Sequence, residues 1–139
     1  PLGMGTALLA FAPGGMSFDD YFGFSRCDNE LDMAVHFLVG LSPAMLQRGY
    51  VADMSRLNLA ERKGPSSGAA CQLCAGVAAI EPLKLLLGRK GVLLAPWGSH
   101  FDAYRMKYVH TWRPGGHRNP LQRLMRYLVK MQLNRTKPS

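Results

Sequence analysis

The order of apolar and polar positions predicts a strand and then a helix in the first third of the chain. Residues 6–11 form a short apolar run closed by Pro13-Gly14-Gly15, which predicts a buried strand followed by a turn. No partner strand follows nearby, so we expect this strand to pair with chain outside the sequence. Residues 31–41 carry apolar side chains at the spacing of one helical face, which predicts a helix. A second short helix is expected over residues 43–49.

The middle of the chain predicts one long buried helix. Residues 68–87 are small or aliphatic around the whole helical circumference, and a helix of that kind is expected inside a core. Ser66 or Ser67 can cap its start, and Gly88 suits a left-handed carboxyl-terminal cap. The polar residues 58–67 predict a connecting loop. No apolar run reaches the roughly 18 residues needed to span a bilayer, so we expect a soluble cytoplasmic protein.

An antiparallel hairpin is predicted after this helix. Residues 99–112 predict two strands around a turn at residues 102–105, where Asp102 is expected to make turn hydrogen bonds. Residues 106–113 alternate with a period of two. One face of the second strand is largely apolar and contains Met106, Tyr108, His110 and Trp112. Residues 92–95 predict a further short strand.

The last segment predicts a basic amphipathic helix. Asn119 can cap it and Pro120 suits its first position. The face expected to dock carries Leu121, Leu124, Met125 and Leu128, and the other face carries Arg123, Arg126 and Lys130. We therefore divide the chain into a body, residues 1–115, and a basic helix with its tail, residues 116–139.

The net charge of +8 belongs to the carboxyl-terminal quarter of the chain. Residues 1–100 hold eight basic and eight acidic residues, whereas residues 101–139 hold nine basic residues and Asp102 alone. A basic face of this kind either attracts an acidic partner or a membrane surface, or is simply solvated. Specific nucleic-acid binding is not expected, because only Trp112 and Tyr127 are available for stacking on bases.

The three cysteines, Cys27, Cys71 and Cys74, do not make an even disulfide framework, which favours a reducing compartment. Cys71 and Cys74 lie one helical turn apart and can ligate one zinc ion, but a structural site needs four ligands, and Cys27 and His117 are the only additions in view. Packing as small core residues and a redox role are the alternatives. Glu81 and Lys84 are spaced to pair on the long helix.

No catalytic residue is assigned from the sequence. The four histidines lie far apart, and none has a serine, cysteine or carboxylate at a diagnostic spacing. No glycine-rich loop joins a strand to a helix, so the chain does not cradle a nucleotide by itself.

These elements, in this order, resemble the carboxyl-terminal half of a ThiF/MoeB-type adenylyltransferase, a family related to ubiquitin-activating enzymes. The resemblance covers about residues 1–115 and is most specific over residues 71–103. The family's long helix ends in Glu-x-Leu/Ile-Lys-x-Leu-x-Gly, matched by Glu81, Leu83, Lys84, Leu86 and Gly88, and its hairpin opens on an aromatic-Asp-Ala triplet, matched by Phe101-Asp102-Ala103. Residues 2–15 and 18–27 match the strand and crossover that precede them.

The resemblance implies an α/β fold: the carboxyl-terminal part of a Rossmann-like domain, with a mixed sheet, a β-hairpin, a long buried helix and a terminal amphipathic helix. It implies a whole protein that binds ATP and magnesium in an upstream half and adenylates the carboxyl terminus of a ubiquitin-like or sulfur-carrier protein. This half would supply the substrate side and part of a homodimer interface, and would be inactive alone.

The chain departs from the family's zinc site, which uses two Cys-x-x-Cys pairs. The second pair should follow the hairpin, where this chain has Arg118-Asn119-Pro120. Cys71 and Cys74 are therefore the candidate metal ligands without a second pair, and Cys27 receives no role. The alternative function is a non-catalytic interaction module whose basic helix binds an acidic partner. Pro1 in place of Met indicates an upstream extension, or residues left by cloning before a start at Met4.

Overall fold

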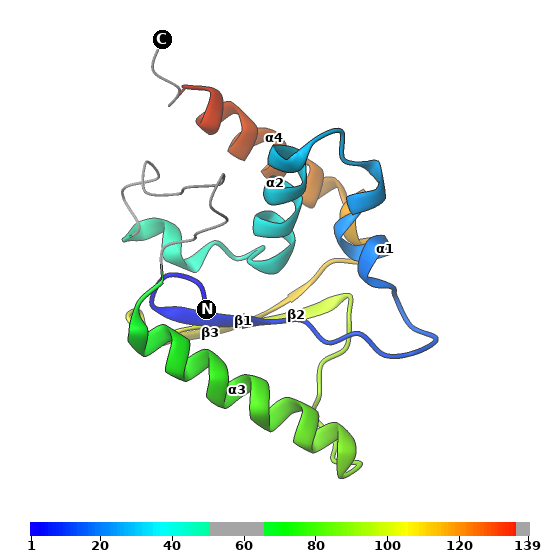
Figure 1. The fold of residues 1–139 in the computed structure, drawn as a ribbon, viewed down its shortest axis with the longest axis vertical. Helices are drawn as coiled ribbons and strands as arrows, with labels where there is room; N and C mark the ends of the chain where they lie inside the picture. Colours follow the sequence, from blue (N-terminus) through cyan, green and yellow to red (C-terminus); the bar gives the residue numbers. More distant parts are fainter. Residues whose placement is uncertain (51–65, 136–139) are drawn as a thin grey trace.

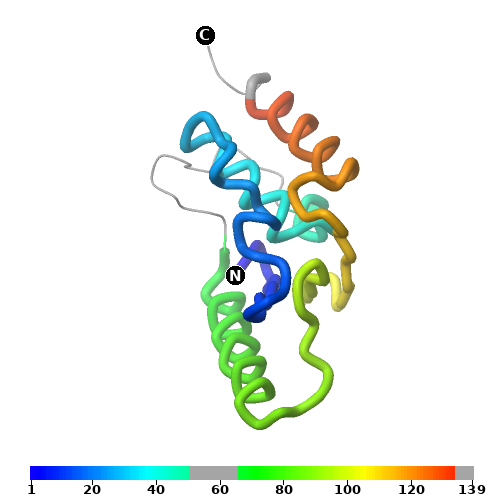
Figure 2. The backbone as a smooth tube through the Cα atoms, turned by 90° about the vertical axis from the view of Figure 1, so that its right-hand side faces the viewer, coloured from blue at the N-terminus to red at the C-terminus, as the bar shows by residue number. Residues whose placement is uncertain are grey.

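The computed structural model describes residues 1–50 and 66–135 and has a sheet between helices (Figure 1). The sheet contains β1 (Gly5–Leu8), β2 (Trp97–Asp102) and β3 (Lys107–Trp112) in that order. The longest helix, α3 (Gly68–Leu86), lies on one side of it. The other side holds α1 (Phe18–Phe22), α2 (Glu30–Leu41) and α4 (Pro120–Arg135), so α3 forms one end of the molecule (Figure 2).

Three short 3₁₀ helices complete the described elements: η1 (Phe24–Arg26), η2 (Leu46–Gly49) and η4 (Gly116–Arg118). The helix expected over residues 43–49 is therefore present only as η2. The helix expected over residues 31–41 is confirmed as α2, one residue longer at its start. Most of the loop expected over residues 58–67 lies outside the described residues.

The sheet differs from the expected mixed sheet, because all its strand pairings are antiparallel. The hairpin of β2 and β3 is confirmed. The expectation that the opening strand pairs with chain outside the sequence is wrong, because β1 pairs with β2. Gly5 pairs with Asp102, and Leu8 pairs with Ser99. That pairing joins distant parts of the sequence, which a local hydrophobic pattern does not reveal. Residues 92–95 form no strand, and Leu94 makes only an isolated bridge with Ala10.

A small apolar core lies between α2 and α4. Val35, Val39 and Val129 are buried there, and Leu38, Met45, Met125 and Leu133 pack against them. The face of α4 expected to dock is wrong in part, since Leu121, Leu124 and Leu128 are exposed while Met125 contacts the core. The helix carries two apolar stripes, and its packing against α2 uses the stripe of Met125 and Val129.

The expectation that α3 is buried is wrong within the described residues. Of its side chains only Ala70 is buried, while Leu83 is 53% exposed and Leu86 is 84% exposed. Among the named elements α3 packs mainly on β1. By length and composition alone, α3 is long and apolar enough to cross a membrane, contrary to the expectation that no segment could. An apolar helix with this much exposed surface indicates that another polypeptide or another part of the protein packs on it.

The ends of α3 follow the sequence prediction. The Ser67 hydroxyl accepts a hydrogen bond from the Ala70 amide at 3.1 Å, which satisfies one of the free donors of the first turn. Gly88 adopts a positive φ of 60° just beyond the helix, and the Arg89 amide donates to the Lys84 carbonyl at 2.8 Å. This arrangement is a left-handed carboxyl-terminal cap.

The joint between η4 and α1 requires a glycine. Gly116 has a φ of 51°, and a Cβ atom added there would lie 2.4 Å from the Asp20 carbonyl oxygen. The next residue fixes the same joint, because the His117 Nδ1–H donates to the Asp20 carbonyl at 2.8 Å. The Arg126 guanidinium then donates to the His117 carbonyl at 2.7 Å. Residues 116–135 are thereby tied to the amino-terminal part of the chain.

Substituting Gly116→Ala should destabilise the protein more than Gly88→Ala. Both glycines have left-handed backbones, which costs an alanine roughly 1–2 kcal/mol. Only Gly116 also faces a backbone clash, because nothing lies within 4 Å of a Cβ at Gly88, and overpacking adds about 1–3 kcal/mol. Urea unfolding of the two variants measures the difference. Equal losses would show that the η4–α1 contact is looser than described.

Candidate functional site

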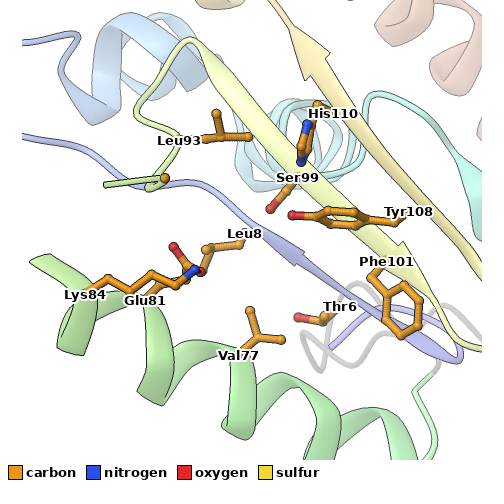
Figure 3. Close-up of a pocket in the computed structure, with 11 residues that line it drawn as sticks. Thr6, Leu8, Val77, Glu81, Lys84, Leu93, Ser99, Phe101, Tyr108 and His110 are labelled. Atoms are coloured by element: carbon orange, nitrogen blue, oxygen red, sulfur yellow. The ribbon is translucent and has the colours of Figure 1, made fainter. Parts of the chain in front are cut away.

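A groove of about 470 Å³ lies between α3 and the face of the sheet that α3 covers only in part (Figure 3). The strand register builds one wall. Thr6 pairs with Phe101 and Phe101 with Tyr108, while Leu8 pairs with Ser99 and Ser99 with His110. Because residues paired across antiparallel strands share a face, these six side chains form two rows across the sheet.

The helix wall of the groove comes from one side of α3. Val77, Glu81 and Lys84 recur at helical spacing and point toward the sheet (Figure 3). The expected pairing of Glu81 with Lys84 is confirmed as an ion pair, in which the glutamate side chain is the less exposed partner. The groove therefore combines apolar walls with one fixed pair of charges.

Aromatic side chains dominate the open part of this sheet face. Tyr108 is 60% exposed, and its ring lies 4.7 Å from that of His110 and 6.3 Å from that of Phe101. Further along the same face, Trp97 stacks on Trp112 at 6.1 Å. Exposed aromatic area of this extent is typical of a surface that another polypeptide covers. The sequence predicted the apolar face of β3 but gave no sign that it would be open.

The opposite face of the sheet is closed and holds a polar network. Tyr50 donates its hydroxyl proton to Asp102 Oδ2 at 2.5 Å, and the Arg105 amide donates to Asp102 Oδ1 at 2.9 Å. The turn hydrogen bond expected at Asp102 is therefore confirmed. The Tyr50 oxygen also accepts from the Met4 amide at 2.9 Å, which links the network to the start of β1.

Ser42 and His100 form the one contact of this network that resembles a nucleophile and its base. The serine hydroxyl donates to Gln47 Oε1 at 3.1 Å, so the contact with His100 Nδ1 at 3.1 Å is one in which the imidazole donates. Ser42 is fully buried and His100 is 2% exposed, so no substrate reaches either group. Burial lowers the pKa of His100, against the opposing effect of Asp102. The pair is structural.

The two cysteines proposed as metal ligands lie near the start of α3. Cys71 is exposed, which rules out the core-packing interpretation for it, and Cys74 is half-buried. A hydrogen bond with Thr6 is the main cause that lowers the pKa of Cys74. Within residues 1–50 and 66–135, neither belongs to a group of three metal-binding side chains. Cys27 lies instead beside Asp32 and His36, so metal binding by Cys71 and Cys74 stays a prediction.

Comparisons of the chain with protein-family models, with curated proteins and with solved structures gave no match. The features that bear on function are therefore the groove, the exposed surface of α3 and the residues that carry the family resemblance. Most of those residues lie in α3 and at the end of β2, and both of these elements line the groove.

The free energy of unfolding should fall as the pH drops from 7 to 5. Because the pKa of His100 in the folded protein lies below 6.5, His100 binds a proton more readily in the unfolded chain than in the folded one. The stability that the neutral imidazole contributes is therefore lost as the pH falls below about 6.5. The pKa of His36 is lowered chiefly by burial and acts in the same direction. Substituting His100→Asn should make the dependence shallower, which urea unfolding at several pH values measures. An unchanged slope would show that His100 is not the buried neutral group described.

Proposed function

We propose that residues 1–139 form the substrate-facing half of a ThiF-type adenylyltransferase. The whole enzyme would use ATP and magnesium to adenylate the carboxyl terminus of a ubiquitin-like or sulfur-carrier protein. The proposal rests on the exposure of α3. This helix contains most of the family-like run from Glu81 to Gly88, and most of its apolar surface is exposed. In the proposed enzyme the nucleotide-binding half covers that surface.

The family-like triplet Phe101-Asp102-Ala103 supports the same proposal by its position. Phe101 lines the open groove, while the adjacent Asp102 is fully buried on the closed face and holds Tyr50 and Arg105. The two neighbours thus fix the hairpin relative to both layers of the fold. A hairpin fixed in this way is a rigid wall against which a second half can pack.

In the proposed reaction, a carboxylate oxygen of the carrier protein attacks the α-phosphorus of ATP and pyrophosphate leaves. The product is an acyl-adenylate. ATP and magnesium would be held by residues outside this chain. The residues described here contribute packing and positioning, and we assign none of them a catalytic role.

The alternative, an interaction module that works through its basic helix, has less support. Arg126 donates to the His117 carbonyl, and Lys130 forms an ion pair with Asp32. Two of the three cations on the predicted basic face are therefore paired within the fold, although Lys130, like Arg123, is exposed. Insertion of α3 into lipid is also less favoured, because the Glu81–Lys84 pair lies in its second half and faces the sheet.

The proposal predicts how two matched leucine substitutions affect adenylation in the product of the whole reading frame. Leu83 on α3 and Leu124 on α4 are each 53% exposed in this chain. Leu83→Asp should reduce ATP–pyrophosphate exchange at least about tenfold, because a buried carboxylate at a half-to-half contact is strongly unfavourable. Leu124→Asp should change it less than about twofold, the effect usual for a surface substitution.

Residues 1–139 alone should show no exchange. Equal effects of the two substitutions would contradict the role given to α3. Absence of exchange in the whole product, together with salt-sensitive binding of an acidic partner that Arg123→Gln weakens, would favour the interaction module instead.

A further inference from the structure

A group of metal-binding side chains lies on the other side of the sheet from the groove. Cys27 is the carboxyl-terminal cap of η1, and Asp32 and His36 follow one helical turn apart on α2. Their ligand atoms all lie within 4.8 Å of one another. The cluster combines a thiol, a carboxylate and an imidazole, and it is separate from Cys71 and Cys74 on α3.

The imidazole of His36 is already oriented for a metal. Its Nδ1 lies 2.7 Å from the Phe22 carbonyl oxygen, which can only accept, so Nδ1 carries the proton. The neutral ring then presents the lone pair of Nε2 toward Asp32, whose Oδ1 is 4.0 Å away. A backbone carbonyl on the far ring nitrogen is the usual way in which proteins fix a metal-binding histidine.

Asp32 provides a buried carboxylate oxygen that is paired with a cation from another helix. The residue is 8% exposed, and its backbone amide is held by the Asn29 side chain at 2.9 Å in the helix cap. Its Oδ1 is buried and receives no well-formed hydrogen bond. The cation beside it is the ammonium of Lys130 from α4, whose side chain is 47% exposed. A long, half-exposed lysine can leave this position without disturbing the backbone.

We propose that Cys27, Asp32 and His36 bind one zinc ion, with the Lys130 ammonium displaced into solvent. Zinc accepts sulfur, nitrogen and oxygen ligands in a tetrahedral arrangement. With metal–ligand bonds of about 2.0–2.3 Å, its ligand atoms lie roughly 3.3–3.8 Å apart, so each ligand here needs to move inward by about 1 Å or less. The Cys27 thiol releases its proton to the solvent as the sulfur–zinc bond forms. Water occupies the fourth position.

The site has a built-in competitor. Lys130 neutralises Asp32 in the metal-free protein, and Arg126 is a second cation on the same helix that acts electrostatically on both Asp32 and Cys27. Zinc must therefore replace the ammonium and overcome the repulsion of the guanidinium. Removing the charge of Lys130 should therefore strengthen zinc binding. If Lys130 only supported the structure of the site, its removal would not strengthen binding.

Cobalt(II) titration of the full chain tests the proposal. In a Cys71→Ser, Cys74→Ser background Cys27 is the only thiol, so a thiolate-to-cobalt charge-transfer band reports on it alone. The band should appear with the visible absorption of tetrahedral cobalt, and zinc should displace it. Adding Cys27→Ser, Asp32→Asn or His36→Gln should weaken binding at least about tenfold, whereas His110→Gln on the opposite face should leave it unchanged.

Lys130→Gln in the same background should bind cobalt more tightly. Far-ultraviolet circular dichroism checks that each variant is folded. The proposal is overturned if the double-serine protein gives no band, if the band survives His36→Gln in a folded protein, or if Lys130→Gln weakens binding. The first and last of these outcomes need no ligand variant to fold, and none of them depends on adenylation activity.

Discussion

The pairing of β1 with β2 is the interaction on which the arrangement of the other elements depends. It brings the first residues of the chain to the hairpin near residue 100 and completes the three-stranded sheet between the two helical layers. Because α3 packs mainly on β1, the same pairing places α3 beside the face that carries Phe101 and Tyr108. Without this pairing, nothing would hold the groove and the polar network on opposite faces of one sheet.

The two faces of this sheet have opposite characters because successive residues of a strand point to opposite sides. On β2, His100 and Asp102 enter the closed side, where η2 contributes Gln47 and where Tyr50 and Ser42 complete their hydrogen bonds. Ser99 and Phe101 enter the side that α3 covers only at β1. A buried polar network fixes one side, although His100 Nε2 has no hydrogen-bond partner among the described residues. On the other side, the described residues leave an apolar surface exposed.

Local signals in the sequence predicted local structure well. The Ser67 cap, the left-handed Gly88, the extent of α2 and the Asp102 turn each depend on a few neighbouring residues, and all are confirmed. The errors concern choices that neighbours do not decide. The apolar composition of α3 predicted a buried helix, but it could not show that the described residues would leave most of it exposed. The two apolar stripes on α4 did not decide which of them packs against α2. The grouping of Cys27 with Asp32 and His36 requires η1 to turn back on α2, which residue spacing alone did not reveal.

We propose that the exposed surface of α3 packs against another part of the same protein. Hydrogen–deuterium exchange of the amides of residues 75–87 tests it most directly, by comparing residues 1–139 with the product of the whole reading frame. These amides should exchange at least about tenfold more slowly in the larger protein, because packing suppresses the local opening that exchange requires. Equal exchange rates in the two proteins, with the larger one folded, would contradict it.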